Sequence, residues 1–365
     1  MVPNPDIRCR NSAVRARWRG VANVDGARLS TGACSGLVLP GDRVDDPGMD
    51  DELAPIRGEI RSPGFRRISQ GLFLPLSAGL DSREEWRREL SAWRLVLPAD
   101  AAFTHITAAA LYDWWLPQLP EFVPVFAATR LDDNRPRRAG LSCSRLDQPS
   151  QVQVRYGLPV DSPHEVLLRA ARDLGLLDLV VLVDAALHLR DVTPDSLADF
   201  CRSSRPGVRR LRVAVGLADG RSESAWETAL RLFHRFAGIE VTPQAELVDA
   251  DGNFVARVDL LVNGRKFAHE YDGAVHDQRP RRTKDLRRQR RIADIGVVRR
   301  GYTAPDLVVH PQVTLHELDR ALGRRHRPGR LRRWTRWLEE SCFSESGRRR
   351  LQNRWLMHGQ WSRTA

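Results

Sequence analysis

The sequence has few of the features that mark secreted, zinc-binding or disulfide-rich proteins. Its five cysteines (Cys9, Cys34, Cys143, Cys201 and Cys342) are scattered, odd in number and without the paired spacing of metal ligands. This pattern argues against a disulfide framework or a zinc ribbon, and it favours the reducing environment of the cytoplasm. Internal repeats and a glycine-rich phosphate loop are also missing, which excludes repeat arrays and P-loop nucleotide hydrolases.

Long apolar runs are missing too. The most apolar stretch, residues 174–189, is interrupted by Asp178, Asp184 and His188 and is too short to cross a bilayer. The N-terminal residues carry scattered arginines without the continuous apolar segment of a secretory signal. We therefore expect a cytoplasmic protein with no membrane partner.

Lysine is almost absent, because Lys266 and Lys284 are the only lysines among 58 Lys and Arg residues. The formal net charge is nevertheless +12, and its position in the chain is informative. Between Asp277 and Arg350, Lys and Arg number 21 whereas Asp and Glu number nine, so this segment accounts for the whole excess. A concentrated basic segment is typical of proteins that bind the phosphate backbone of nucleic acids.

Length and composition predict two domains with additional segments. A chain of 365 residues exceeds one typical domain, and an apolar fraction of 42% is sufficient for packed cores. We expect residues 1–56 to be a poorly structured extension and residues 57–215 to form an α+β domain. Residues 216–323 are expected to form an α/β domain, and residues 324–365 a basic C-terminal tail.

The second domain contains a β-hairpin signal. Residues 254–262 and 266–272 are extended apolar runs, and Asn263-Gly264 between them is typical of a tight hairpin turn. Around this hairpin we expect a helix at 224–237, a strand at 244–249, a basic helix at 281–295 and a strand at 296–300. The expected order is helix, three strands, helix, strand.

Acidic residues converge on this hairpin. Glu270 and Asp272 point to one face of their strand, and Asp259 can lie beside them on the neighbouring strand. Three carboxylates on one face repel one another unless a cation lies between them, and oxygen ligands suit Mg²⁺ or Mn²⁺. Glu227 is either a fourth ligand or a carboxylate that stabilises the start of its helix. The alternative is a set of solvated carboxylates on an exposed sheet.

Further candidate residues follow the acids. His276 is either a general acid or base, or a loop histidine that contacts phosphate or solvent. Four arginines on the basic helix are candidate phosphate contacts because they cluster beside the proposed metal site. These are Arg281, Arg282, Arg287 and Arg288.

Four sequence blocks occur in a fixed order: Ser224-Ala-Trp-Glu227, Ala256-Arg-Val-Asp-Leu260, Glu270-Tyr-Asp-Gly273 with His276, and Asp285-Leu-Arg-Arg288. Together with the expected elements, they resemble the PD-(D/E)XK nuclease superfamily, and in particular its very-short-patch-repair-like endonuclease branch. The resemblance covers about residues 222–305. It implies a restriction-endonuclease-like fold and metal-dependent hydrolysis of phosphodiester bonds in DNA.

The sequence departs from the superfamily pattern at one catalytic position. The third-strand lysine of the superfamily is replaced by Asp272. Lys284 or Arg288, from the following helix, can supply a positive group in its place. If neither does, the alternative is a catalytically inactive nucleic-acid-binding protein that keeps the nuclease fold.

The upstream region has a resemblance of its own. Residues 104–111 and 157–163 resemble the AbiEi-type antitoxin architecture, in which residues 71–75 and the strand before them resemble the wing of a winged helix. A helix–turn–helix before this wing is not recognisable in residues 1–63. The resemblance makes the inactive alternative an antitoxin-like transcriptional regulator, while the missing helix–turn–helix argues against operator reading by the N-terminal half. Whether the partner is a toxin or a second copy of the chain stays open.

Overall fold

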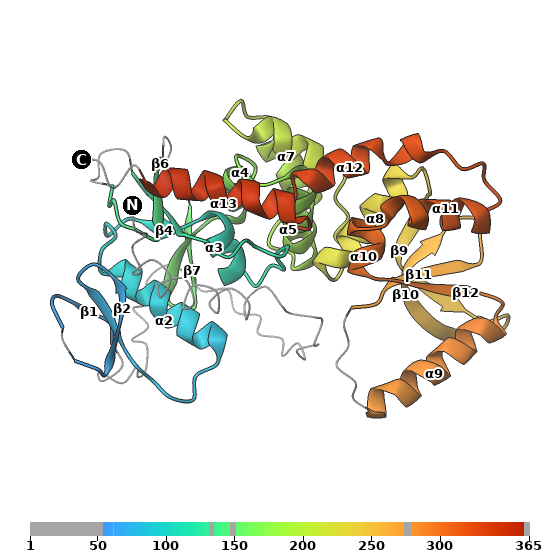
Figure 1. Ribbon diagram of the computed structural model, residues 1–365, viewed down its shortest axis with the longest axis horizontal. Coiled ribbons are helices and arrows are strands. Elements are labelled where there is room, and N and C mark those ends of the chain that lie inside the picture. The colour runs from blue at the N-terminus through green and yellow to red at the C-terminus, as the bar shows by residue number, and fades with distance from the viewer. Residues whose placement is uncertain (1–53, 61, 131–134, 147–150, 274–278, 361–365) are drawn as a thin grey trace, which may run out of the picture. The chain divides into compact units, whose positions relative to one another are not determined.

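The computed structural model describes residues 54–360, apart from 61, 131–134, 147–150 and 274–278, and leaves out the side chains of 130, 146, 279–285 and 358–360. The described residues form a mixed α+β structure with three sheets (Figure 1). They fall into two compact units. The first contains the described parts of residues 1–103, 121–161 and 355–365, and the second contains residues 104–120 and 162–354.

The first unit begins with a small antiparallel sheet and a helix. The sheet has the order β1-β3-β2, and β2 and β3 form a hairpin at the position of the expected wing. Helix α2 begins with a capping box, in which Asp81 accepts the amide of Glu84 and the Glu84 carboxylate accepts the amide of Asp81. The elements are β1 (Ile56–Arg57), β2 (Phe65–Ser69), β3 (Leu72–Pro75) and α2 (Ser82–Arg94).

A five-stranded sheet completes this unit, in the order β6-β5-β4-β8-β7. Its strands are β4 (Ala102–Phe103), β5 (Val125–Arg130), β6 (Leu141–Leu146), β7 (Val152–Arg155) and β8 (Leu158–Asp161). The sequence pattern predicts a loop at 157–163, whereas the structure has β8 there. Leu158 and Val160 are buried, which explains why this Gly- and Pro-containing segment is extended and paired on both sides.

Helices dominate the first part of the second unit. They are α3 (His105–Leu111), α4 (Pro163–Ala170), α5 (Leu176–His188), α6 (Pro194–Phe200), α7 (Val208–Val215) and α8 (Ala225–Phe236). Helix α5 is the apolar stretch noted in the sequence, and its residues from Leu177 to Ala186 are buried. None of the helices that the structure describes is long and apolar enough to cross a membrane.

Two buried acids attach α5 to its neighbours. Asp184 accepts hydrogen bonds from Arg231 and Thr228 of α8, at 2.6 and 2.7 Å. Asp178 accepts the hydroxyl of Ser341 at 2.6 Å and the amide of Cys342. These contacts satisfy carboxylates that would otherwise be costly to bury.

The four-stranded sheet of the second unit has the order β12-β11-β10-β9. Its strands and their connecting helix are β9 (Val241–Val248), β10 (Phe254–Val262), β11 (Phe267–Tyr271), α9 (Arg279–Asp294) and β12 (Val298–Tyr302). Strands β9, β10 and β11 are antiparallel neighbours, whereas β11 and β12 are parallel and are connected through α9. The element order from α8 to β12 is the one expected from the sequence.

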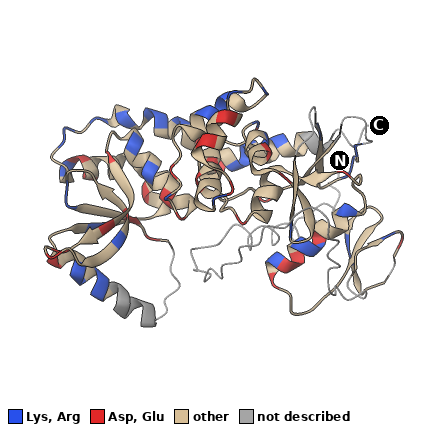
Figure 2. Cartoon of the chain, turned by 180° about the vertical axis from the view of Figure 1, so that it is seen from behind, with Lys and Arg blue, Asp and Glu red and all other residues tan. Residues whose placement is uncertain are grey.

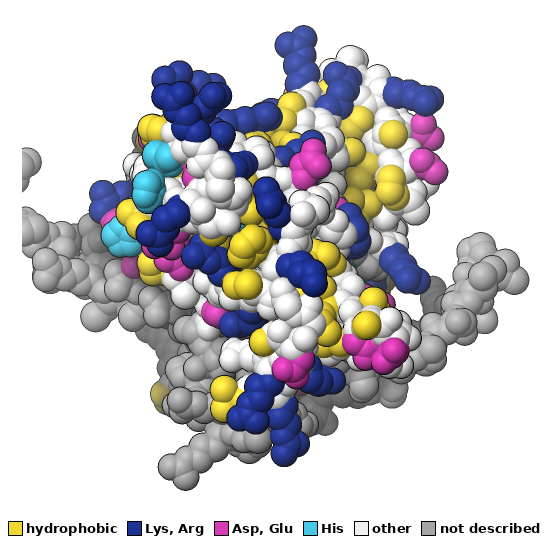
Figure 3. Space-filling view, turned by 90° about the vertical axis from the view of Figure 1, so that its right-hand side faces the viewer, with side chains coloured by type: hydrophobic (Ala, Val, Ile, Leu, Met, Phe, Trp, Pro, Cys, Tyr) yellow, Lys and Arg dark blue, Asp and Glu magenta, His cyan; other side chains and the backbone are white. Residues whose placement is uncertain are grey.

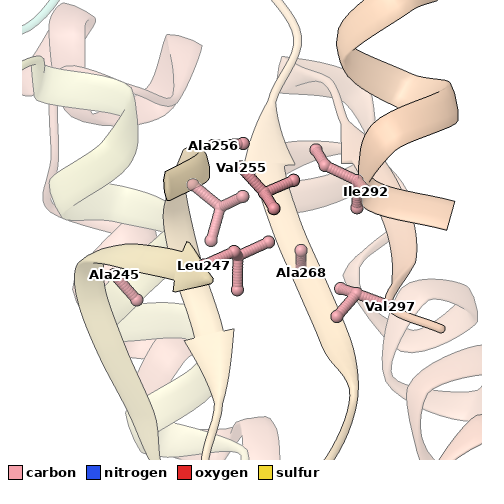
Figure 4. Close-up of a cluster of buried hydrophobic side chains, with 8 residues drawn as sticks. Ala245, Leu247, Val255, Ala256, Ala268, Ile292 and Val297 are labelled. Atoms are coloured by element: carbon pink, nitrogen blue, oxygen red, sulfur yellow. The ribbon is translucent and has the colours of Figure 1, made fainter. Parts of the chain in front are cut away.

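Helices α8 and α9 cover opposite faces of this sheet. Ile292 of α9 packs with Ala268, Val255 and Val297 (Figure 4). His269 points to the other face, where its ring contacts His234 of α8. Because successive side chains of a strand alternate between faces, Glu270 lies on the α9 side with Ala268.

The hairpin turn forms where the sequence places it. Asn263 and Gly264 connect β10 to the turn before β11, and Gly264 has φ +67°. This left-handed conformation is costly for residues with a Cβ atom, so glycine suits the position. The turn sets the register that brings the acids of β10 and β11 together.

Residues after 323 are structured within the described range, which corrects the expectation of a basic tail. After α10 (Ala304–Val308) and α11 (Pro311–Ala321), the chain forms η3 (Pro328–Leu331), α12 (Arg332–Glu339) and α13 (Glu345–Gln360). Trp334, Cys342 and Phe343 are among its buried side chains. The high charge of this segment conceals the regular spacing of its apolar residues.

The buried Asp178 provides a test of the packing around α5. Burial raises the pKa of Asp178 to about 6 from 3.8, against the hydrogen bonds from Ser341 and Cys342. The native state therefore keeps its proton to higher pH than the unfolded chain does. The stability that this gives is complete below pH 3.8 and is lost as pH rises through about 6. The loss is roughly 3 kcal/mol.

We expect Asp178→Asn to remove this pH dependence. As the pH rises from 3.8 to about 6, the wild type loses unfolding free energy and the variant does not. Urea unfolding at several pH values measures it. The exposed Asp195→Asn is the control. Parallel curves for the wild type and Asp178→Asn would show that the Asp178 carboxyl does not keep its proton in the folded protein.

Candidate functional site

The hairpin places Asp259 opposite Glu270. Leu260 pairs with His269 and Leu261 with Ala268, so the next antiparallel pair is Asp259 and Glu270. The Oδ2 atom of Asp259 accepts the backbone N–H of Tyr271 at 2.9 Å. The two carboxylates thus share the face of the sheet that α9 covers.

Glu270 is almost fully buried and is held by two arginines. Arg288 of α9 donates to both carboxylate oxygens, at 3.1 Å for the Nη1–Oε2 pair. Arg299 of β12 donates its Nε to Oε2. Burial alone would raise the pKa of Glu270, but the hydrogen bonds and charges of Arg288 and Arg299 outweigh it and lower the pKa. Glu270 is therefore an ionised carboxylate at neutral pH.

Asp259 is in the opposite electrostatic situation. Burial raises its pKa to about 7, and repulsion from Glu227 and Glu270 adds to the effect, whereas the hydrogen bond from Tyr271 opposes it. Among the described residues, Asp259 has no ion pair with an arginine or lysine. This carboxylate lacks a counter-charge in direct contact.

Glu227 lies in the first turn of α8 and joins this group. Its Oε2 atom accepts the amide of Glu223 and the side-chain amide of Gln244, each at 2.8 Å. Burial raises the pKa of Glu227 despite these hydrogen bonds. Both interpretations of Glu227 therefore have support, since it complements the helix start and also repels Asp259 electrostatically.

Asp272 is exposed and lies at the edge of the group. Its carboxylate forms an ion pair with Arg299, which also pairs with Glu270 and thereby bridges the two acids. A Cβ atom at Gly301 of β12 would clash with the carboxylate of Asp272. Only glycine at this position leaves room for the observed Asp272 side chain.

The donor set fits Mg²⁺ or Mn²⁺ in its chemistry. Glu227, Asp259 and Glu270 are oxygen donors from three elements, and the repulsion between them would be relieved by a cation. In the described part of the chain, however, no three Asp, Glu, His or Cys side chains are arranged to hold a metal. Both oxygens of Glu270 accept guanidinium groups, so a metal bound by Glu270 must displace at least one of them.

Most of the remaining predicted residues have side chains that the structure does not describe. His276 lies outside the described residues, and so do the side chains of Lys284, Arg281 and Arg282. Arg287 is exposed on α9.

Arg288, predicted as a phosphate contact or as a substitute for the missing lysine, lies against the Glu270 carboxylate. Besides Glu270, it binds the carbonyl oxygen of Arg257 at 2.6 Å. Its guanidinium is therefore part of the carboxylate group in this structure.

Sequence reasoning misses Arg299 and the histidine pair. Arg299 is in register with Ala268 on the neighbouring parallel strand, which places it on the face of Glu270. A signal is present, because Val298-Arg-Arg300 follows a predicted crossover helix. His234 and His269 share a hydrogen bond of 2.8 Å between Nε2 and Nδ1, and burial lowers the pKa of each, to about 4 and about 2. Both histidines are therefore neutral, on the face of the sheet away from the acids.

Comparisons with models of protein families, with curated proteins and with solved structures gave no match to this chain. The candidate site is thus defined by its own geometry.

Cation binding at this site can be measured without an activity assay. We expect Mn²⁺ to bind the wild-type protein in calorimetric titrations and Asp259→Asn to abolish that binding, because the variant loses a charged donor and the repulsion that a cation would relieve. Asp251→Asn, in the exposed turn between β9 and β10, is the matched control and should bind as the wild type does. Equal binding by the wild type and Asp259→Asn would contradict the site.

Proposed function

We propose that this protein is a metal-dependent endonuclease that hydrolyses phosphodiester bonds in nucleic acid, with DNA as the expected substrate. The observation that carries the proposal is the placement of Asp259 of β10 opposite Glu270 of β11, with Glu227 of α8 close enough to repel Asp259. The element order from α8 to β12 supports a restriction-endonuclease-like domain and agrees with the resemblance to the PD-(D/E)XK superfamily.

In this proposal Asp259 and Glu270 hold Mg²⁺ or Mn²⁺, and Asp272 and Glu227 complete the set. A metal bound there would lower the pKa of a water molecule and stabilise negative charge on the scissile phosphate. Asp259 suits this role because it is half-buried and has no ion pair among the described residues. Arg288 and Arg299 orient the Glu270 carboxylate, and once displaced they are free to hold a phosphate oxygen.

An arginine does not replace the missing lysine as a base. The guanidinium keeps its proton at neutral pH, so Arg288 and Arg299 act through charge and hydrogen bonds alone. Proton transfer is assigned to His276 and a positive contact with the attacking water to Lys284, as proposed from the sequence. Both assignments concern side chains outside the described set.

A separate observation favours a second candidate function. Glu270 is neutralised by Arg288 and Arg299, and the third-strand lysine is missing. This arrangement favours a catalytically inactive nucleic-acid-binding protein, such as an antitoxin-like transcriptional regulator, that keeps the fold as a scaffold.

The two functions differ in metal-dependent cleavage. For an endonuclease, we expect Glu270→Ala to abolish cleavage, because the metal supplies most of the electrostatic stabilisation. Lys284→Ala should weaken it only modestly. The measurement is a time course on plasmid and oligonucleotides with Mg²⁺ or Mn²⁺, with a chelator and with Asp251→Ala as controls.

Absence of wild-type cleavage on DNA and RNA, together with retained binding, would establish the inactive alternative. Full activity of Glu270→Ala would place the reaction elsewhere in the molecule.

The exposed arginines of α9 give a second measurable property. Arg287, Arg290 and Arg291 are exposed, and α9 shows blue segments in Figure 2. If they contact phosphates, replacing all three by alanine should lower the log–log salt slope of duplex DNA binding by about 0.9 for each phosphate that is no longer bound. Fluorescence anisotropy over a range of salt concentrations measures it. An unchanged slope would make this face of α9 a solvated surface.

A further inference from the structure

A second basic surface lies after the candidate site, on η3, α12 and the loop before them. Residues 324–336 contain seven arginines and one histidine but no acidic residue. Two of these arginines point inward and five outward. We call the outward five the arginine surface: Arg325, Arg327, Arg332, Arg333 and Arg336.

The inward pair fixes the segment to the domain. Arg324 and Arg330 donate to Oδ1 of the buried Asp319, at 2.6 and 2.7 Å. Arg324 also donates to the carbonyl oxygens of Ala237 and Gly238 at the end of α8. These two arginines stabilise the fold. Asp319 balances their charge, and carbonyl oxygens at the end of α8 accept hydrogen bonds from Arg324.

The arginine surface has no such partners. Within the described residues, none of its five guanidinium groups makes an ion pair or a hydrogen bond to a side chain or backbone atom. Some other exposed arginines of this unit are paired, as in Arg202 with Asp199 and Arg349 with Glu345. Five unpaired like charges within a short segment repel one another, and an anionic partner would remove that repulsion.

The backbone beneath this surface is held rigidly. Leu331, Trp334 and Trp337 are buried on the inner side of η3 and α12, and Trp334 Nε1 donates to the carbonyl oxygen of Leu307 at 3.0 Å. Arg333 lies over the rings of Phe236 and Trp337, at 4.9 and 5.0 Å from their centroids. A preorganised surface loses less conformational entropy on binding than a flexible tail does.

The chemistry of the surface favours nucleic acid over a lipid membrane. A helix that binds a membrane surface presents apolar side chains outward, whereas the tryptophans of α12 point into the protein. Arg332 and Arg336 are one turn apart, about 6 Å along the helix. One strand of a duplex carries a phosphate about every 3.4 Å along the helix axis, so two arginines at this spacing can contact neighbouring phosphates. Figure 3 shows Lys and Arg side chains gathered along the upper edge of this face of the molecule.

We propose that the arginine surface is a second contact for the phosphodiester backbone of nucleic acid, distinct from α9 and the carboxylate site. The inference rests on the proposed function for the class of partner, but it does not require cleavage. It gives the protein a longer footprint on its substrate than the carboxylate site and α9 alone provide.

The test compares two variants of the full chain that lose the same charge. In the first, all five residues of the arginine surface are replaced by glutamine. The control replaces five other exposed arginines of the same unit: Arg190, Arg202, Arg209, Arg221 and Arg349. Binding to duplex DNA, single-stranded DNA and RNA is measured over a range of salt concentrations, and circular dichroism melting confirms that both variants are folded.

We expect the log–log salt slope on duplex DNA to fall in the first variant by about 0.9 for each phosphate that is no longer bound, and to change less in the control. A lower salt slope in the first variant, together with no cleavage by the wild type, supports this surface and refutes the endonuclease. Cleavage by the wild type with equal slopes for both variants refutes only this surface. Binding of the wild type to phosphatidylserine vesicles but to no nucleic acid would also overturn it.

Discussion

Burying a carboxylate is costly unless a cation or several hydrogen bonds accompany it, and this constraint organises the second unit. The unit buries several acids, and most have an arginine: Asp184 with Arg231, Asp319 with Arg324 and Arg330, and Glu270 with Arg288 and Arg299. Asp178 relies on hydrogen bonds instead. Most of these pairings connect elements that are distant in the sequence. Asp259 and Glu227 are the exception, because they repel each other with no ion pair to a basic residue in the described structure.

The absence of an ion pair at Asp259 and Glu227, within the described structure, distinguishes the carboxylate site from the arginine-paired acids elsewhere in this unit. Two half-buried acids that repel each other are stabilised if a cation binds between them. Beside them, Arg288 and Arg299 already neutralise Glu270, so a metal and two guanidinium groups compete for one carboxylate. The same competition separates an active endonuclease from an inactive scaffold. In our proposal, catalysis requires that a bound metal prevail over the arginines when nucleic acid supplies phosphates to them.

Arginine has two separate uses in this chain, and sequence position does not distinguish them. Arg324 and Arg330 are interior partners of Asp319, whereas Arg325 and Arg327, from the same basic run, are exposed and unpaired in the described structure. The difference follows from which side of the segment each residue occupies once Trp334 and its neighbours are buried. Net charge alone is therefore only the basis for expecting an anionic partner, and it does not give the position at which such a partner would bind.

The sequence by itself determined the local features from α8 to β12. The Asn263-Gly264 turn, the apolar alternation of β10 and the strong charge of α9 depend on neighbouring residues, so their elements were predictable. Asp259, Glu270 and Asp272 were recognisable as a group, with Glu227 as a candidate fourth member. Only the tertiary structure decided what surrounds them. Arg299 reaches Glu270 through a parallel strand pairing across a crossover helix, β8 forms because Leu158 and Val160 are buried, and the expected tail folds because Trp334 packs on α8. Such contacts join residues far apart in the chain, and no local pattern of side chains specifies which distant partner will neutralise a buried charge.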